Sequence, residues 1–163
     1  MAVLPIRLFP DPVLRAKSKP VDLKDKGLGK LIADLVETLY AQPSGIGIAA
    51  AQVGRGVRLA VMDVSPRDPS KKRFVLINPV ILKAEGEVLS REGCMSLPDY
   101  TATIKRASRV QFEWRDELGR PQKQWASGIE AICIQHELDH LDGTLFIDRV
   151  ASLKTDIYPR RRR

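Results

Sequence analysis

Histidine and cysteine are scarce in this chain, which contains two of each among 163 residues. It also lacks an uninterrupted apolar run long enough to span a membrane, and its first residues, interrupted by Pro5 and Pro10, lack the pattern of a secretion signal. No internal repeat or break in composition divides the chain. With 44% hydrophobic residues it can bury one core, so we expect a single cytoplasmic domain, whose few thiols suit a reducing compartment.

Both histidines lie within five residues, His136-Glu137-Leu138-Asp139-His140. Residues four apart lie on the same face of a helix, with Cβ atoms about 6 Å from each other, so both imidazoles can bind one divalent metal. Glu137 lies beside them and need not be a ligand, which makes it a candidate base for a water activated by that metal. Taken alone, the pattern also fits an ordinary helix with two packed or solvated histidines.

Signals at both ends predict a helix around this motif. Ser127, three residues before Glu130, predicts a capping box, and Gly143 predicts the residue that ends the last turn. A helix buried nearly all round is expected, because its apolar residues point to more than one side: Ile129, Ile132, Ile134, Leu138 and Leu141. Histidines and a glutamate in a buried helix need polar partners, and a metal provides them.

The absence of a third histidine means that another residue type must complete the metal site. Metalloproteases with the extended motif have a histidine or aspartate where this chain has Phe146, and no glutamate follows Gly143 to act as in thermolysin-like enzymes. A cysteine is the best remaining ligand. Cys133 shares the helix with both histidines and would crowd one side of the metal, so a role as a small buried apolar residue suits it better. Cys94, in a turn bounded by Gly93 and Pro98, can approach from elsewhere.

A third segment, residues 44–54, is rich in glycine and alanine and follows an expected helix over residues 28–39. Its small residues allow close approach of the backbone, and Gln52 is a polar side chain in apolar surroundings. The segment has no GKS or GKT ending, so a nucleotide-binding loop is disfavoured. Taken alone, it fits a plain glycine-rich turn.

GIGIAAAQ at 45–52, EGCMS at 92–96 and QHELDH at 135–140 resemble, in their order and separations, the three signature motifs of bacterial peptide deformylases. The resemblance extends from PDPVLR at 10–15 to the segment at 146–148. It implies an enzyme that hydrolyses the N-formyl group from the formyl-methionine of nascent polypeptides and releases formate. It also implies one Fe²⁺ per chain, replaceable by zinc, nickel or cobalt, with Cys94, His136 and His140 as ligands.

The same resemblance implies roles for other residues. Glu137 would be the general base and acid, and Gln52 with the backbone N–H of Met95 would form the oxyanion site. Substrate-binding positions are implied for Ile46, Gly47, Glu92, Gly93, Ile129, Ile132 and Cys133. Glu92 and Gly47 would help to hold the substrate as an added strand, while the aliphatic residues would line a pocket for methionine. These aliphatic residues equally fit an ordinary core, and Tyr100-Thr101 replaces an arginine that some relatives carry near the peptide-binding rim.

The expected fold class is α+β, with antiparallel or mixed sheets packed around a buried central helix that carries HExxH. The residue patterns predict strands over residues 58–64, 74–82, 88–90, 110–115 and 122–125. One long helix precedes most of these strands, and the metal-binding helix follows them. That order disfavours a parallel βαβ architecture.

Positive charge is concentrated at one end of the sequence. Residues 160–163 supply four of the seven net positive charges, so we divide the chain into a catalytic domain, 1–158, and a basic tail, 159–163. Such a run is usually a solvated terminus. The alternative is contact with ribosomal RNA near emerging nascent peptides, although the segment is shorter than the basic helix of ribosome-binding relatives and is broken by Pro159. Neither DNA nor a membrane is expected as a partner.

Two other functional classes remain open. A zinc peptidase of another family would cleave internal peptide bonds, and release of formate without endopeptidase activity would separate it from a deformylase. A non-catalytic binding module would hold a structural metal. Glu137 disfavours that module, because a structural site needs no general base and usually closes its fourth position with a protein ligand.

Overall fold

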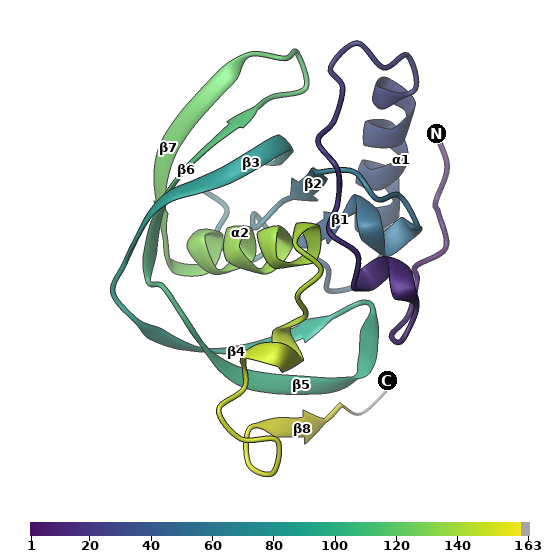
Figure 1. Cartoon of the computed structure of the whole chain (residues 1–163). Coiled ribbons are helices and arrows are strands. Elements are labelled where there is room, and N and C mark those ends of the chain that lie inside the picture. Colours follow the sequence, from purple (N-terminus) through teal and green to yellow (C-terminus); the bar gives the residue numbers. More distant parts are fainter. Residues whose placement is uncertain (161–163) are drawn as a thin grey trace.

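The structure is a computed structural model that describes residues 1–160 (Figure 1). These residues form two α-helices and two β-sheets. The helices are α1 (Leu28–Tyr40) and α2 (Gly128–Leu141). Short 3-10 helices join other elements, namely η1 (Pro12–Leu14), η2 (Ala50–Val53) and η3 (Phe146–Arg149). The pairs between neighbouring strands of both sheets are antiparallel.

The larger sheet has five strands in the spatial order β1-β2-β3-β6-β7, and the smaller has three in the order β4-β5-β8. The larger sheet contains β1 (Gly47–Ala49), β2 (Leu59–Met62), β3 (Phe74–Glu85), β6 (Arg109–Arg115) and β7 (Pro121–Ser127). The smaller sheet contains β4 (Val88–Cys94), β5 (Leu97–Arg106) and β8 (Ile157–Pro159). Since β3 pairs with β6, the β4–β5 hairpin is an excursion from the larger sheet that returns before α2.

Helix α2 lies between the larger sheet and the β4–β5 hairpin (Figure 1). Its apolar residues join one core cluster with inward-facing side chains of the larger sheet, including Ala60, Met62, Leu76, Val110 and Phe112. Burial of these apolar side chains therefore holds the helix against the larger sheet. Its His140 faces the smaller sheet, where it contacts Cys94 at the end of β4.

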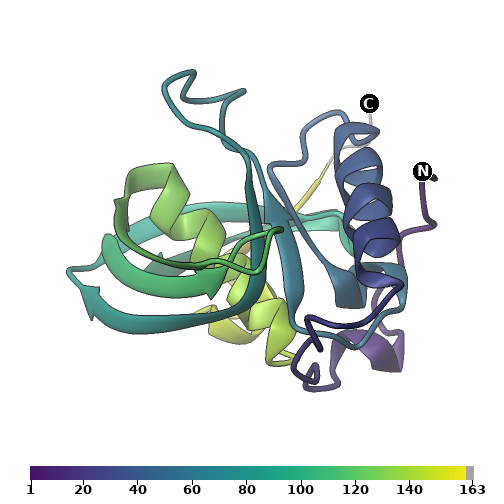
Figure 2. The ribbon, with the colours of Figure 1, turned by 90° about the horizontal axis from the view of Figure 1, so that it is seen from above.

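The end of the larger sheet formed by β1 and β2 is buried on both faces. Side chains alternate along a strand, so Ile48, Leu59 and Val61 pack with α1, whereas Ala60 and Met62 pack with α2. Figure 2 accordingly shows α1 and α2 on opposite sides of these strands. Helix α1 has one apolar face, with Leu35 and Leu39 buried, which is enough to cover the outer side of the sheet.

The smaller sheet is anchored by a third cluster, in which Leu97 and Ile104 pack with Leu14 and Phe146. The chain reaches Phe146 through Gly143, which has a φ of 75°. A Cβ at this position would also collide with the backbone oxygen of Arg15. Glycine is therefore required where the chain turns from α2 toward the smaller sheet.

The predicted fold class is confirmed: antiparallel sheets enclose a buried helix that carries HExxH. Both predicted helices form, and each predicted strand has a counterpart within a few residues. The predictions did not include β1, β5 and β8. They also treated the segment around Cys94 as a turn, but residues 92–94 belong to β4 and only Met95 and Ser96 connect β4 to β5.

The predicted capping box at the start of α2 is wrong. Ser127 is the residue before the helix, but its side chain makes no capping hydrogen bond, and the Glu130 carboxylate lies 3.9 Å from Lys71 Nζ. Ser127 also ends β7, where pairing with Arg109 holds it extended. Gly128, with a φ of 60°, makes the abrupt change from strand to helix.

Across residues 1–160, the helices are all too short or too polar to cross a membrane.

Candidate metal centre

Cys94, His136 and His140 form a cluster that fits one metal ion. Cys94 is the last residue of β4, and the histidines lie one turn apart on α2. One potential ligand atom from each residue lies within 4.8 Å of the others. Cys94 Sγ is 3.3 Å from His140 Nε2, and the two imidazole centroids are 5.0 Å apart. One sulfur and two imidazole nitrogens suit zinc or ferrous iron better than magnesium or calcium, which prefer oxygen ligands.

Cys94 and Cys133 are both buried, but the charges near their thiols differ. Burial raises the pKa of Cys94, but the positive charge of His140 and hydrogen bonds with both histidines outweigh it and hold that pKa well below its usual value. Burial raises the pKa of Cys133, and repulsion from Glu137 raises it further. Cys94 therefore favours the thiolate that binds a metal, whereas Cys133 stays protonated, with its Sγ 3.6 Å from the backbone oxygen of Ile46.

Glu137 lies beside the cluster and is only 2% exposed. Its Oε2 has no hydrogen-bond partner among the described residues, which is costly for a buried carboxylate unless a ligand or water donates to it. Burial raises the pKa of Glu137, although the charges of the two histidines oppose the increase. A raised pKa suits a carboxylate that takes up and returns a proton near neutral pH.

Gly47 gives Glu137 its space. A Cβ on Gly47 would lie 2.7 Å from Glu137 Oε1 and 2.9 Å from Cys133 Sγ, closer than atoms can pack. The glycine-rich segment is thus explained by close approach of β1 to α2, as expected from its small residues. Any side chain here would displace Glu137 or move β1 away from the site.

Gln52 places its amide next to Cys94. The residue is 1% exposed and lies in η2, directly after β1. Its Oε1 accepts a hydrogen bond of 3.0 Å from the Ala49 N–H, so its Nε2 is turned the other way, 3.4 Å from Cys94 Sγ and 3.1 Å from Ser96 Oγ. The amide therefore presents a donor at the edge of the metal cluster.

A chain of buried ion pairs fixes the other side of His136. Glu92 Oε1 lies 2.8 Å from His136 Nδ1, and the Glu92 carboxylate also accepts two hydrogen bonds, of 2.7 and 2.8 Å, from Arg106. Burial raises the pKa of Glu92, but its bonds to Arg106 and His136 outweigh burial and lower that pKa to about 2. Glu92 thus stays ionised and holds the His136 ring, which leaves Nε2 for a metal.

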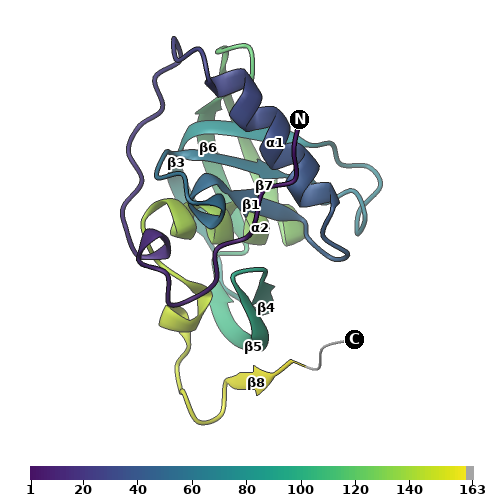
Figure 3. The ribbon, with the colours of Figure 1, turned by 90° about the vertical axis from the view of Figure 1, so that its right-hand side faces the viewer.

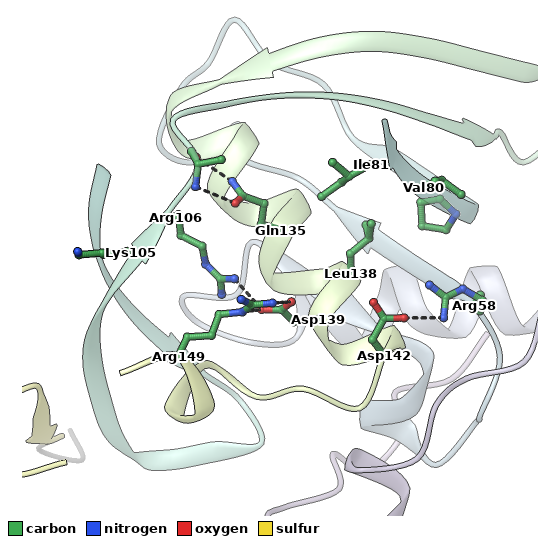
Figure 4. Close-up of a pocket in the computed structure, with 12 residues that line it drawn as sticks. Arg58, Val80, Ile81, Lys105, Arg106, Gln135, Leu138, Asp139, Asp142 and Arg149 are labelled. Carbon is green, nitrogen blue, oxygen red and sulfur yellow. Dashed lines mark hydrogen bonds and ion pairs between the residues drawn. The ribbon is translucent and has the colours of Figure 1, made fainter. Parts of the chain in front are cut away.

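The chain of ion pairs continues to Asp139, three residues after His136 on α2. Arg106 donates a hydrogen bond of 2.6 Å to Asp139, which also accepts two from Arg149, both of 2.6 Å. Figure 4 shows these residues together in an open pocket, with Gln135 and Leu138 on the same side of the helix. Arg58 at the other end of the pocket is paired with Asp142. Arg106 thus connects this pocket to His136 through Glu92.

The remaining sequence-predicted residues lie around the cluster. Ile46 and Ile129 are partly buried and pack against the core that contains α2, and Ile132 is also partly buried. Gly93 is exposed next to Cys94. The side chain of Glu92 is occupied by His136 and Arg106, so only its backbone is available to a substrate. Met95 lies in the turn between β4 and β5, beside Gly45.

Known proteins match nearly the whole of this chain. Residues 3–156 match the model of the family described as polypeptide deformylase. A peptide deformylase of Thermodesulfovibrio yellowstonii is 45% identical over 158 residues, which cover 97% of this chain and 95% of that protein. The chain belongs to the polypeptide deformylase family. It is therefore a metal-dependent hydrolase that removes the formyl group from N-formylmethionyl nascent peptides.

Solved structures of deformylases have the same fold. The enzyme of Legionella pneumophila superposes with a TM-score of 0.87 at 38% identity, covering 94% of this chain and 89% of that one. The enzyme of Synechococcus elongatus, solved in complex with actinonin, also superposes with a TM-score of 0.87. It is 39% identical, and the match covers 94% of this chain and 84% of that one.

Four residues of this deformylase site were not singled out from the sequence: Ser96, Arg106, Asp139 and Arg149. Asp139 offered a signal, because a carboxylate in the middle of a buried helix requires a cation. Arg106 offered none, since an arginine at the end of a strand is usually solvated. Its partners, Glu92 and Asp139, lie 14 and 33 residues away in sequence.

Proposed function

We propose that this deformylase hydrolyses the formyl amide with Glu137 as general base and acid and with Cys94, His136 and His140 as metal ligands. The observation that carries the proposal is the buried Glu137 carboxylate, whose Oε2 lacks a partner among the described residues, next to the only Cys/His/His cluster found in them. A divalent metal bound there would polarise the formyl carbonyl and lower the pKa of a water. The raised pKa of Glu137 suits proton uptake from that water.

Glu137 would act twice in the reaction. It first accepts a proton as the water oxygen forms its bond to the formyl carbon. It then gives that proton to the amide nitrogen as the carbon–nitrogen bond breaks, so formate and a free methionine amino group are the products. Gly47 supports both steps because it leaves room for the carboxylate to stay against the reacting atoms.

Negative charge on the formyl oxygen would be met by the Gln52 amide and by the backbone N–H of Met95. Gln52 Nε2 is directed toward Cys94 and Ser96 by the bond between its Oε1 and Ala49. A donor fixed before the reaction needs little reorganisation when charge develops, and removal of one such donor typically costs about 10²- to 10³-fold in kcat.

The substrate backbone would bind as a strand beside β1. That strand is at the edge of the larger sheet, and Gly93 lies on β4 near the other side of the site. Methionine would enter a pocket formed by Ile46, Gly47, Ile129, Ile132 and Cys133, and the backbones of Gly47, Glu92 and Gly93 would hold the peptide. The bound peptide would leave the site toward Ser44. The other direction is closed, because the Ala49 N–H is bound to Gln52 and η2 follows β1.

We assign Fe²⁺ as the resident metal, at one ion per chain, with zinc, nickel or cobalt as substitutes. A single thiolate with two neutral imidazoles leaves a net charge of about +1 on a divalent site, which suits a softer or redox-active metal. The cytoplasm, where thiols stay reduced and nascent peptides are made, is the proposed location. The proposal also includes contact with the ribosome through the basic tail, residues 159–163, and a catalytic domain over residues 1–158; residues 161–163 lie outside the described part.

A formate-release assay on anaerobically purified protein tests the proposal. The wild type should contain one iron per chain and release formate from formyl-Met-Ala-Ser without cleaving internal peptide bonds. Glu137→Gln should keep the metal and the fold but lose about 10²- to 10⁴-fold in turnover, because the proton carrier is gone. Formate release at the parental rate by a metal-loaded Glu137→Gln protein would show that Glu137 is not the base.

A further inference from the structure

Arg160 lies next to Ser44 and Gly93, which border the proposed substrate path, although the sequence groups it with the basic tail. It follows β8, which pairs with β5 so that Tyr158 is opposite Thr101. The Arg160 backbone N–H then donates a hydrogen bond of 2.7 Å to the Asp99 oxygen, which extends the pairing past Pro159. Figure 3 shows β8 running alongside β5 at the outer edge of the smaller sheet. Arg160 is thereby held by the fold.

The Arg160 guanidinium spans two segments that border the proposed substrate path. Its Nη2 is 3.5 Å from Ser44 Oγ, just before β1. Its Nη1 is 3.1 Å from the position that a Cβ on Gly93 would occupy, and Thr101 Cγ2 is 3.4 Å from the same position. The positive charge of Arg160 thus lies over Gly93 of β4 and next to Ser44, which precedes β1. A side chain at residue 93 would push it away.

The length of the path determines which substrate residue meets Arg160. The methionine must lie near Gly47, because Glu137 is there, and the peptide must run toward Ser44. A strand rises by about 3.3 Å per residue, so a peptide antiparallel to β1, with its methionine level with Gly47, brings its third residue level with Gly45, next to Ser44. Arg160 and Ser44 are both exposed, so a side chain can reach them from solvent.

We propose that Arg160 is a specificity-determining residue that binds a carboxylate at the third residue of the formylated peptide. The inference rests on the proposed substrate path. In a nascent chain the carboxylate would belong to an aspartate or glutamate side chain, and in a free tripeptide it could also be the terminal carboxylate. An arginine binds either carboxylate through paired N–H donors. Because the pair is exposed, its effect is modest, about two- to fivefold in kcat/KM at low salt.

The test compares C-terminally amidated peptides, formyl-Met-Ala-Asp and formyl-Met-Ala-Lys, with the wild type and Arg160→Gln. The wild type should prefer the aspartate peptide about two- to fivefold, through KM rather than kcat, and the preference should shrink at high salt. Arg160→Gln should lose the preference, but it should still release formate from formyl-Met-Ala-Ala amide at the parental rate. A free-acid formyl-Met-Ala-Ala peptide reports separately on the terminal carboxylate.

Arg91→Gln is the matched control. Arg91 is on β4 and stacks over the Tyr158 ring at 4.2 Å, so its removal takes the same charge from the same sheet without touching Ser44. The preference should survive in this variant. Equal loss in both variants, an unchanged preference in Arg160→Gln, or a preference that acts at the second residue instead would overturn the assignment. Absence of formate release from every peptide would instead contradict the proposed function.

Discussion

At the scale of single residues, the environment decides the role of each cysteine. Both thiols are buried, but Cys94 faces two imidazoles and Cys133 faces the Glu137 carboxylate and the Ile46 oxygen. The first setting stabilises a thiolate and the second opposes one. The sequence already favoured Cys94, because Cys133 shares a helix with both histidines; the structure adds the charges that separate their pKa values.

The two serine variants should therefore differ in metal content. Cys94→Ser should lose most of its bound metal, because a hydroxyl is a poor anionic ligand at neutral pH, whereas Cys133→Ser should keep one metal per chain. Cys133→Ser should lose at most some stability, since the hydroxyl can still donate to the Ile46 oxygen. Metal analysis of both purified variants, side by side with the wild type, measures this. Equal loss in both, or loss only in Cys133→Ser, would contradict the ligand assignment.

At the scale of elements, α2 connects the candidate metal site to a network of buried ion pairs. His136 and His140 lie one turn apart, and Asp139, on the neighbouring side of the helix, binds Arg106 and Arg149. Arg106 also binds Glu92, so one buried guanidinium neutralises two carboxylates from different elements. Removal of such a partner leaves charges buried without compensation.

Arg106→Met should therefore lower the free energy of unfolding by about 3–5 kcal/mol, the usual range for breaking a buried ion pair. Arg149→Met is the control, because the Arg149 side chain is 46% exposed and Asp139 keeps its bond to Arg106. That variant should lose at most about 1 kcal/mol. Urea unfolding at equal metal loading compares the two; similar losses would mean that Arg106 has no special part in the network.

The stability of the β6–β7 hairpin depends on pH through the ionisation of Asp116. Desolvation raises the pKa of this carboxyl, but hydrogen bonds from Arg120, Gln122 and Leu118 outweigh it and lower the pKa from 3.8 to about 2. Since the folded-state pKa lies below the unfolded value, the stabilisation is present above pH 4 or so and is lost as the pH falls toward 2. Asp116→Asn should reduce stability at pH 7, and its difference from the wild type should be small at pH 2 and vanish below it.

Chemical denaturation at several pH values follows this difference. Glu117→Gln removes the same charge from the same turn, but Glu117 is exposed and has no hydrogen-bond partner within residues 1–160. It should leave the stability unchanged throughout. A deficit in Asp116→Asn that persists undiminished at pH 2 would mean that the carboxylate charge does not stabilise the turn.

The sequence predicted elements with strong periodicity and missed those that depend on pairing. Helix α1 has one apolar stripe, and α2 contains the HExxH motif and is followed by Gly143, so both helices were predicted. Strand β1 has three residues in a glycine- and alanine-rich segment, and its partner β2 lies about ten residues further along. Strand β8 pairs only with β5, and Pro98 and Asp99 near the start of β5 are typical of a loop.

The site follows the same division. The clustering of Cys94, His136 and His140 could be predicted, because three short motifs contain these residues and their neighbour Glu137. The network of Arg106 could not, because its partners converge from β4, β5 and α2 only after folding. The position of Arg160 likewise depends on β8, so a basic run in the sequence could not separate it from residues 161–163.

At the scale of the whole molecule, the metal site joins parts that otherwise have separate cores. The histidines belong to α2, which packs with the larger sheet, whereas Cys94 belongs to the cluster of the smaller sheet. A metal held by all three residues would therefore link the two sheets. Such a ligand stabilises the folded state, because the unfolded chain does not hold the three residues together.

Removal of the metal should consequently lower stability as well as activity. At a metal concentration of about 1,000 times the Kd, binding contributes about 4 kcal/mol, which corresponds to a Tm difference of roughly 10 °C for a chain of this size. A chelator should produce this shift in the wild type, and hydrogen exchange should increase in β4 and β5 more than in β3 and β6, because the smaller sheet then keeps only the ion pairs of Glu92 and Arg106 as polar links to α2. Cys94→Ala should melt at the lower temperature with or without chelator. If the chelated and the metal-loaded wild type melt at the same temperature, or if hydrogen exchange rises equally in both sheets, the metal does not join the two sheets.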